Sequence, residues 1–275
     1  MVKDLLAIDG HWTAELLTRF LRVELERTGL RDFVVGLSGG IDSAVSTALA
    51  ARAVGPDRVH AYLLPYRQSS AASIDDALEV AENLALKTER VDISPMIDGF
   101  EEASGDVGRH RLGNVMARAR MTILFDRSLK RNALVLGTSN KTELLLGYGT
   151  LHGDLASALN PIGDLYKTQV LALAEFLELP ESVRKKPPSA DLWPDQTDED
   201  DLGFSYERID RLLIAMIDQR HDDEVLIAAG FERSMIDDVR QRIVRTQFKR
   251  MPPVIGKVSL RTIGWDFRYP RAWKS

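Results

Sequence analysis

The sequence contains no cysteine. Disulfides, iron–sulfur clusters and thiol nucleophiles are therefore excluded, and so are cysteine-based zinc fingers. None of the five histidines falls in a zinc-binding spacing such as HExxH, so no zinc site is expected. The chain also lacks an apolar run approaching the ~20 residues of a membrane span, and its first residues contain no run of signal-peptide length. We therefore expect a cytoplasmic protein with no membrane partner.

The chain also has no excess of positive charge. The chain carries 36 lysines and arginines against 41 aspartates and glutamates, which gives a net charge of −5 and a pI near 5.6. A general nucleic-acid binder normally has a basic domain, so no nucleic-acid partner is expected. An anionic small molecule is still compatible with this composition, because phosphate sites are built locally from backbone amides and a few cations.

The composition that is present is that of a globular protein, with 275 residues of which 44% are apolar and 28% charged. In the first half, short apolar runs alternate with amphipathic segments. We expect strands at residues 33–37, 58–64, 88–93 and 133–136, and helices at residues 13–28, 41–54, 74–87 and 114–130. This alternation predicts an α/β fold with an open, Rossmann-like parallel sheet and helices on both faces.

The character of the sequence changes after residue 187. Prolines and an acidic run at residues 198–201 indicate a connecting loop. We then expect helices near residues 206–217, 224–229 and 234–245, followed by a packed tail rich in proline and aromatic residues. The sequence predicts one domain with an α/β core (1–187), a C-terminal helical extension (188–253) and a tail (254–275).

The most informative segment lies between the first predicted strand and the helix after it. It consists of Gly36, Leu37, Ser38, Gly39, Gly40, Ile41, Asp42 and Ser43. Glycines let the backbone approach an anion, and the free amides of a helix start attract it. The segment is not a Walker loop, since no lysine follows the glycine pair, and its glycine spacing is not that of the dinucleotide fingerprint. An acid inside such a cradle indicates Mg²⁺, which prefers oxygen ligands. The alternative is a plain strand-to-helix turn with a serine cap, which requires neither two glycines nor an aspartate.

Residues 38–43 resemble the SGGxDS loop of N-type ATP pyrophosphatases, which bind the pyrophosphate part of ATP and split it between the α and β phosphates. Six further segments resemble the NAD synthetase family, in the family's order. They are residues 113–121, 137–143, 147–154, 160–169, 188–192 and 248–253. A single match of this kind is weak, whereas six in order over most of the chain identify a resemblance to the family.

By position, the resemblance implies a role for each matching residue. Residues 36–43 would hold the ATP phosphates, and the other ATP-binding residues would be Thr138, Lys167 and Ser189. The substrate-binding residues would be Arg118, Glu143, Asp154 and Lys249, and the Mg²⁺ ligands Asp42 and Glu143. Asp42 and Lys167 would be catalytic, because a cation beside a departing pyrophosphate stabilises the charge that develops on it. The family binds its dinucleotide across a dimer interface, so a homodimer is also implied.

The implied reaction is the ATP- and Mg²⁺-dependent amidation of deamido-NAD (nicotinic acid adenine dinucleotide) by ammonia. It passes through an adenylated intermediate and gives NAD, AMP and pyrophosphate. Related glutaminase domains use a cysteine, which this chain lacks, and its length leaves no room for a second catalytic domain, so free ammonia is the expected nitrogen donor. Three alternatives stay open: a synthetase subunit supplied by a separate glutaminase, another ATP pyrophosphatase such as a GMP synthetase core or a tRNA lysidine synthetase, and a nucleotide sensor without catalytic activity.

Taken singly, several of these residues have a plainer interpretation. Arg118 could be an ordinary surface arginine of a helix, and Glu143 could only complement a helix dipole. Lys249 lies in a basic stretch that solvent alone could satisfy. The acidic run at residues 198–201 favours a helix-capping loop over a metal site.

The sequence also departs from the family at three positions. Leu151 and Ala158 stand where some ammonia-only members have lysine and aspartate, and Phe248 stands where the family has a histidine. We therefore expect a dinucleotide pocket that differs in detail from theirs.

Overall fold

The computed structural model describes residues 5–105, 107–187, 189, 198–263 and 266. The described residues form a four-stranded sheet with the strand order β3-β2-β1-β4. Its strands are β1 (Asp32–Gly36), β2 (Val59–Leu63), β3 (Thr88–Arg90) and β4 (Ala133–Val135). All neighbouring strands run parallel, so the predicted α/β fold with an open parallel sheet is confirmed.

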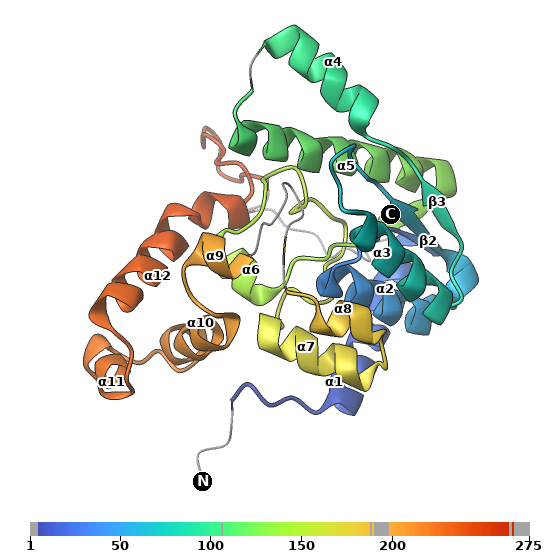
Figure 1. The fold of residues 1–275 in the computed structure, drawn as a ribbon. Helices are drawn as coiled ribbons and strands as arrows, with labels where there is room; N and C mark the ends of the chain where they lie inside the picture. The colour runs from blue at the N-terminus through green and yellow to red at the C-terminus, as the bar shows by residue number, and fades with distance from the viewer. Residues whose placement is uncertain (1–4, 106, 188, 190–197, 264–265, 267–275) are drawn as a thin grey trace.

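Side chains of β1 alternate between the two faces of the sheet. Phe33 and Val35 enter one apolar cluster, and Val34 enters the other. The helices of the first face are α1 (Gly10–Thr28), α2 (Ile41–Val54), α3 (Ala71–Asn83), α7 (Lys167–Phe176) and α8 (Glu181–Lys185). On the opposite face lie α4 (Ser94–Ser104) and α5 (Arg109–Arg131) (Figure 1). Both faces are covered, as the sequence predicts.

Helix α2 determines where the glycine loop lies. It is rich in alanine, the residue with the highest helix propensity, and Ala44 and Ala48 are buried. Because these side chains are small, α2 packs closely against β1 and β2. Its first turn therefore lies at the carboxyl end of the central strand β1.

A second group of helices packs beside the sheet. It consists of α6 (Lys141–Leu146), α10 (Tyr206–Leu213), a π-helical turn (Ile214–Asp218), α11 (Asp223–Ala228) and α12 (Arg233–Arg245). Their apolar cluster includes Leu146 and Tyr166, so the helical extension shares a core with the part of the chain before residue 187. In the described part of the chain, no helix is long and apolar enough to cross a membrane. The division of the chain at residues 187 and 253 stays a prediction.

Helix α4 was not predicted from the sequence. The amide of Ser94 donates to Asp92 Oδ1 at 2.7 Å, and Pro95 follows in the first helical turn. The proline is an ordinary helix-start signal, and the Asp92 carboxylate satisfies one free amide of the first turn, although the N-cap residue Ile93 makes no side-chain capping bond. Met96, Ile97 and Phe100 follow Ile93 at the i+3, i+4 and i+7 spacing of a helix, so the apolar periodicity was present and the prediction overlooked it.

The acidic run forms a short helix, α9 (Asp198–Leu202), instead of the expected connecting loop. The amide of Gly203 donates to the carbonyl of Glu199, and the amide of Tyr206 donates to the Glu199 carboxylate, both at 2.8 Å. Asp198, at the start of the turn, is buried. The loop prediction was wrong because the carboxylates of Asp198 and Glu199 accept hydrogen bonds within this helix's surroundings, which compensate for their charge.

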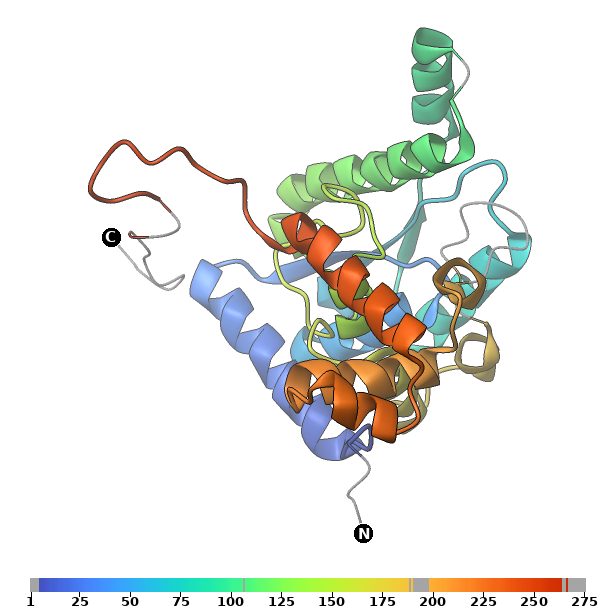
Figure 2. The ribbon, with the colours of Figure 1, turned by 90° about the vertical axis from the view of Figure 1, so that its left-hand side faces the viewer.

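The described end of the chain also differs from the packed tail that we expected. Val254, Val258 and Leu260 are 92%, 100% and 95% exposed. Figure 2 shows this segment as an arm that runs away from the helices. The aromatic residues that suggested a packed tail are Trp265, Phe267, Tyr269 and Trp273, all of which lie outside the described residues.

Candidate active site

The loop between β1 and α2 is held together by its own serines. The amide of Ser38 donates to Ser43 Oγ at 3.2 Å, and that hydroxyl donates to the carbonyl of Gly40 at 2.9 Å. Gly39 has a φ of +78°, and a Cβ on it would lie 2.1 Å from the carbonyl oxygen of Ser73 in α3. Only glycine fits at this position. The loop therefore rests directly on the backbone of α3.

The start of α2 is open toward a ligand. Its N-cap residue, Gly40, makes no side-chain capping bond, and the first amides of a helix have no intrahelical partner. Free amides at the positive end of a helix dipole bind anions. The carboxyl ends of strands in an open parallel sheet are also where such folds bind their ligands. Residues 36–43 thus have the geometry of an anion cradle.

Three charged side chains meet beside this cradle. Lys167, in the first turn of α7, donates a hydrogen bond from Nζ to Asp42 Oδ2, and its Nζ lies 3.6 Å from Glu143 Oε1. Asp42 belongs to the first turn of α2, and Glu143 to the first turn of α6. The Lys167 side chain is 3% exposed and each carboxylate 15%. The structure brings together the residues predicted for catalysis and for Mg²⁺.

Burial acts against the charged forms in this cluster. It raises the pKa of Glu143 well above the usual 4.5; the Asp42 carboxylate adds to the rise and the Lys167 ammonium opposes it. Burial also disfavours the Lys167 ammonium, but the Asp42 and Glu143 carboxylates outweigh it, so the pKa of Lys167 is raised. Lys167 therefore stays charged between the two carboxylates.

The chemistry of these donors fits a magnesium ion. The described residues contain no group of three or more histidines, aspartates or glutamates placed to hold a metal. Mg²⁺ nevertheless commonly takes one or two carboxylates and completes its shell with substrate phosphates and water. Asp42 and Glu143 provide such a pair next to the anion cradle. The assignment of Mg²⁺ to these residues stays a prediction.

Asn140 ties the two carboxylates together. Its Nδ2 donates to Asp42 Oδ1 at 2.9 Å, and its Oδ1 accepts the amide of Glu143 at 2.9 Å. The amide of Asn140 donates in turn to Glu143 Oε2 at 3.3 Å, which completes a capping box at the start of α6. Glu143 therefore caps its helix, as in the plainer interpretation, and faces Lys167 with its other oxygen. We assigned Asn140 no role from the sequence, although its spacing to Glu143 is the signal of a capping box.

The helical extension adds a buried acid to the cluster. Asp198 accepts the hydroxyl of Tyr148 at 2.9 Å and that of Tyr206 at 3.0 Å. The ring centre of Tyr206 lies 5.3 Å from Lys167 Nζ. Burial raises the pKa of Asp198, and the Lys167 ammonium opposes the rise. The sequence reasoning missed both Asp198 and Tyr206, because no local pattern connects them with Lys167.

Two of the predicted substrate residues lie at a second loop, residues 147–155. On α5, Arg118 donates from Nε to the carbonyl of Leu151 at 3.3 Å. Asp154 accepts the amide of Thr150 at 2.8 Å through Oδ1. Both side chains hold the loop in shape, and both are exposed.

Lys249 reaches the same loop from the 3₁₀ turn Gln247–Arg250. Its Nζ donates to the carbonyls of Gly147 and Gly149, each at 2.7 Å. Burial lowers the pKa of Lys249, although Asp154 opposes this shift. The structure therefore brings Arg118, Asp154 and Lys249 to one loop, from which Tyr148 reaches Asp198. The contact of these residues with a dinucleotide stays a prediction.

No described contact joins the two remaining predicted ATP-binding residues, Thr138 and Ser189, to the Lys167 cluster. Thr138 is half-buried just after β4, next to Gly137, whose amide donates to the carbonyl of Leu159 at 2.6 Å. Ser189 is half-buried between residues that lie outside the described part of the chain. Their role as ATP ligands stays a prediction.

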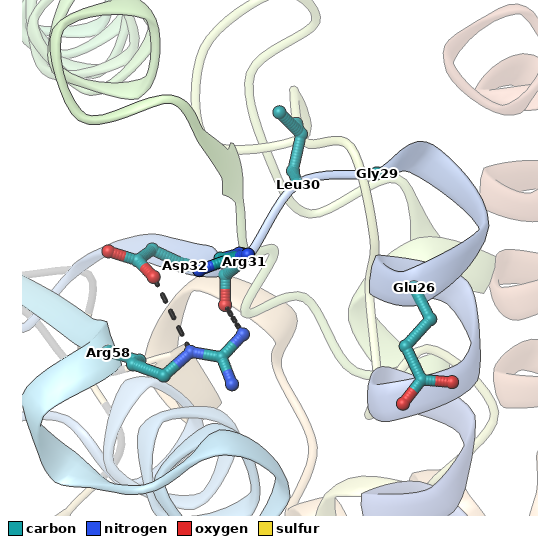
Figure 3. Close-up of a pocket in the computed structure, with 6 residues that line it drawn as sticks. All are labelled: Glu26, Gly29, Leu30, Arg31, Asp32 and Arg58. Atoms are coloured by element: carbon teal, nitrogen blue, oxygen red, sulfur yellow. Dashed lines mark hydrogen bonds and ion pairs between the residues drawn. The ribbon is translucent and has the colours of Figure 1, made fainter.

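A shallow pocket of about 580 Å³ lies at the other edge of the sheet, where β1 starts. Its lining residues are Glu26, Gly29, Leu30, Arg31, Asp32 and Arg58 (Figure 3). Arg58 Nε lies 3.5 Å from Asp32 Oδ1. Because open parallel sheets bind ligands at the carboxyl ends of their strands, this pocket is not the candidate site.

The fold and the site together define a class of protein. A parallel sheet, a glycine loop after its first strand and an open helix start are typical of α/β proteins that bind nucleotide phosphates. Here a buried lysine between two acids lies beside that loop. Within this class, a sequence model of the NAD synthase family matches residues 13–253, and the chain belongs to that family.

Relatives of known name agree with this membership. The chain is 54% identical over 260 residues to the NH3-dependent NAD+ synthetase of Chlorobium phaeobacteroides strain BS1, and the match covers 94% of each chain. Among solved structures, it resembles the NH3-dependent NAD synthetase of Campylobacter jejuni in complex with a nitrate ion, with a TM-score of 0.79, 38% identity and coverage of 91% and 100% of the two chains. It also resembles an NMN synthetase from Francisella tularensis, with a TM-score of 0.80, 30% identity and coverage of 91% and 99%.

Proposed function

We propose that this chain is an ammonia-dependent NAD synthetase. It amidates the nicotinate carboxylate of deamido-NAD and cleaves ATP to AMP and pyrophosphate. The family membership and the 54% identical relative with this name support the proposal. The observation that carries it is the buried Lys167 between Asp42 and Glu143 at the open start of α2. A nucleotide sensor would need the anion cradle, but it would not need a buried lysine beside it.

In the proposed reaction, residues 36–43 hold the ATP phosphates through backbone amides. The nicotinate carboxylate attacks the α-phosphorus, and Lys167 neutralises the charge that develops on the departing pyrophosphate. Ammonia then attacks the adenylated carbonyl and AMP leaves. Lys167 acts as a fixed charge and not as a base, because the neighbouring carboxylates raise its pKa. Much of the rate enhancement comes from holding two anions in line for reaction.

Mg²⁺ is proposed as the metal cofactor. Asp42 and Glu143 would hold it, and it would supply charge neutralisation for the ATP phosphates. Asn140 keeps both carboxylates oriented, because its Nδ2 donates to Asp42 Oδ1 and its backbone amide donates to Glu143 Oε2. Thr138 and Ser189 are proposed as further ATP contacts. Arg118, Asp154 and Lys249 are proposed as dinucleotide contacts.

Free ammonia is proposed as the nitrogen donor. The chain has no cysteine that could act as a glutaminase nucleophile. A homodimer is proposed from the family resemblance, and a cytoplasmic location stays a prediction.

The structural relative named NMN synthetase favours a second candidate acid, the deamido mononucleotide. Both acids carry the same nicotinate carboxylate, so the same chemistry serves either one. They differ in the adenylate half, which a dinucleotide pocket would contact and a mononucleotide would leave empty. The ratio of kcat/KM for the two acids decides between these candidates.

One assay tests the proposal. The purified protein is incubated with ATP, Mg²⁺ and either acid, with ammonium or glutamine, and the release of pyrophosphate and orthophosphate is followed together with the amide product. We expect NAD, AMP and pyrophosphate from deamido-NAD with ammonium, and no product with glutamine alone. Release of orthophosphate instead of pyrophosphate would contradict the proposal, and robust turnover with glutamine alone would contradict the nitrogen assignment.

A further inference from the structure

Asp210 of α10 is a fully buried acid with 0% of its surface exposed. Its Oδ1 accepts the hydroxyl of Thr142 at 2.6 Å. Its Oδ2 accepts the amide of Thr168 at 2.8 Å and the hydroxyl of the same residue at 2.9 Å. One carboxylate of the helical extension therefore binds both α6 and α7.

The two threonines are the immediate neighbours of the reactive side chains. Thr142 precedes Glu143 in the first turn of α6, and Thr168 follows Lys167 in the first turn of α7. The Thr142 hydroxyl also accepts the amide of Lys167 at 3.0 Å. The backbone that carries Glu143 and the backbone that carries Lys167 are thus joined through Thr142 and Asp210.

The bond to Thr168 also caps α7. A carboxylate that accepts an amide in the first turn performs the task of an N-cap side chain and complements the helix dipole. This matters at α7 because a cation in the first turn is unfavourable for the dipole, and Lys167 is such a cation. Asp210 therefore supplies negative charge close to the turn that must hold the lysine.

A second acid, in the π-helical turn that follows α10, also binds residues at the starts of α6 and α7. Asp218, at the end of the π-helical turn, accepts Lys141 Nζ at 3.0 Å and the hydroxyl of Tyr166 at 2.9 Å. Lys141 directly precedes Thr142, and Tyr166 directly precedes Lys167. The Asp218 side chain is 41% exposed, so its contacts compete with water, unlike those of Asp210.

We propose that Asp210 is a positioning residue for the reaction, one that fixes Lys167 and Glu143 at the distance from Asp42 that the pyrophosphate requires. This inference rests on the proposed function. Burying a carboxylate is costly, and helices α6, α7 and α10 could pack through apolar contacts alone. The cost is offset here by hydrogen bonds that all end beside the residues that carry the chemistry.

Two isosteric variants test the inference. In Asp210→Asn, one carboxylate oxygen becomes an NH₂ group that cannot accept a hydrogen bond, so either Thr142 or Thr168 is released. In Thr142→Val, the hydroxyl that joins Asp210 to the Lys167 amide is removed at constant volume. Because a misplacement of about 1 Å can cost about a hundredfold in rate, we expect kcat for pyrophosphate release to fall at least about tenfold in both variants. The KM for ATP should rise by a smaller factor than kcat falls, because the anion cradle is untouched and only the proposed Mg²⁺ ligand Glu143 is loosened.

Three further measurements separate positioning from stability. Thr142→Ser keeps the hydroxyl and should recover most of the kcat lost in Thr142→Val. Asp222→Ala, which removes the distant N-cap of α11, should lower the melting temperature without lowering kcat. Calorimetric binding of Mg²⁺ with a non-hydrolysable ATP analogue should weaken in Asp210→Asn, because Glu143 is no longer fixed.

The inference is overturned if Asp210→Asn and Thr142→Val melt at lower temperatures but keep kcat and analogue binding within about twofold of the parent protein. It is also overturned if Thr142→Ser is as impaired as Thr142→Val. Failure of the proposed function looks different, because the unmodified protein would then release no pyrophosphate with any acid tested.

Discussion

Charged residues lie at both edges of the sheet, and the two sets differ mainly in burial. At the carboxyl edge, the side chains of Lys167 and Asp42 are 3% and 15% exposed. At the amino edge, Asp32 pairs with Arg58 and lies 2.9 Å from His60 Nε2, with side-chain exposures of 25% for Asp32 and 44% for Arg58. The same kinds of side chain therefore meet in two different environments.

The difference in environment sets the strength of these interactions. Exposed ion pairs contribute about 0–1 kcal/mol, because water screens them and long side chains lose entropy. Removing one partner of a buried pair costs about 3–5 kcal/mol, since a charge is left without compensation. Among the residues that the structure describes, the carboxyl edge combines such a buried pair with an open helix start. The effects of substitutions should therefore follow burial and not the number of charges.

The largest effect is expected at Asp42. Asp42→Asn keeps the shape of the side chain and can still accept the bond from Asn140, but it loses the charge that faces Lys167 and the proposed Mg²⁺. We expect kcat/KM for pyrophosphate release to fall at least about a thousandfold, because several kcal/mol of charge stabilisation are lost. Asp32→Asn removes the same charge at the opposite edge and is the matched control. If both variants keep the activity of the parent protein, burial does not distinguish the two edges.

A somewhat smaller loss is expected for Lys167→Met. Methionine fills a similar volume but cannot neutralise the departing pyrophosphate, so kcat should fall by about a hundredfold or more. The variant should also lose thermal stability, since Asp42 and Glu143 are left facing each other without a cation. Lys130→Met, on the exposed last turn of α5, is the control and should change neither quantity. Full activity of Lys167→Met would remove this lysine from the mechanism.

The variant Glu143→Gln should lower activity and, at the same time, change how the stability of the protein depends on pH. The pKa of Glu143 is raised well above 4.5 by burial and by Asp42. The folded protein therefore binds the Glu143 proton more tightly than the unfolded chain, and its stability falls as pH rises from about 4.5 toward the raised value. Glutamine does not titrate and still serves in a capping box. Its melting temperature, relative to that of the parent, should rise with pH, while activity falls at least about tenfold. An activity loss with no pH-dependent gain in stability would show that Glu143 is not strained by burial.

Much of this architecture could be predicted because its signals are local. The buried parts of β1 and β4 are short apolar runs, and the glycine loop lies directly between β1 and α2. Asp42, Glu143 and Lys167 occupy the first turns of three helices, within contiguous motifs, so their roles could be proposed from the sequence. The structure adds that these three first turns meet at one point.

The remaining parts of the site depend on tertiary packing. Asp198 meets Tyr148 across 50 positions of sequence, and Asp210 meets Thr142 across 68. No periodicity or turn signal connects such pairs. From the sequence alone, an acid in a helical segment is expected to face solvent. Asp210 becomes buried because α10 packs against α6 and α7, and the sequence pattern does not show this packing. The helical extension was therefore predicted as an addition to the core, although it supplies buried acids to the site.

The smallest effect is expected at the amino edge of the sheet. Asp32→Asn removes the partner of Arg58 and His60 but leaves the pocket of Figure 3 open to water. Since Arg58 also donates to the carbonyl of Arg31, its side chain keeps one contact, and we expect a loss of stability of at most about 1 kcal/mol. Activity should remain within about twofold of the parent, because no described contact joins this edge to Lys167. Chemical denaturation and the pyrophosphate assay measure the two quantities on the same sample. A large loss of activity would mean that the two edges are coupled through β1, and burial alone would then fail to explain where the chemistry lies.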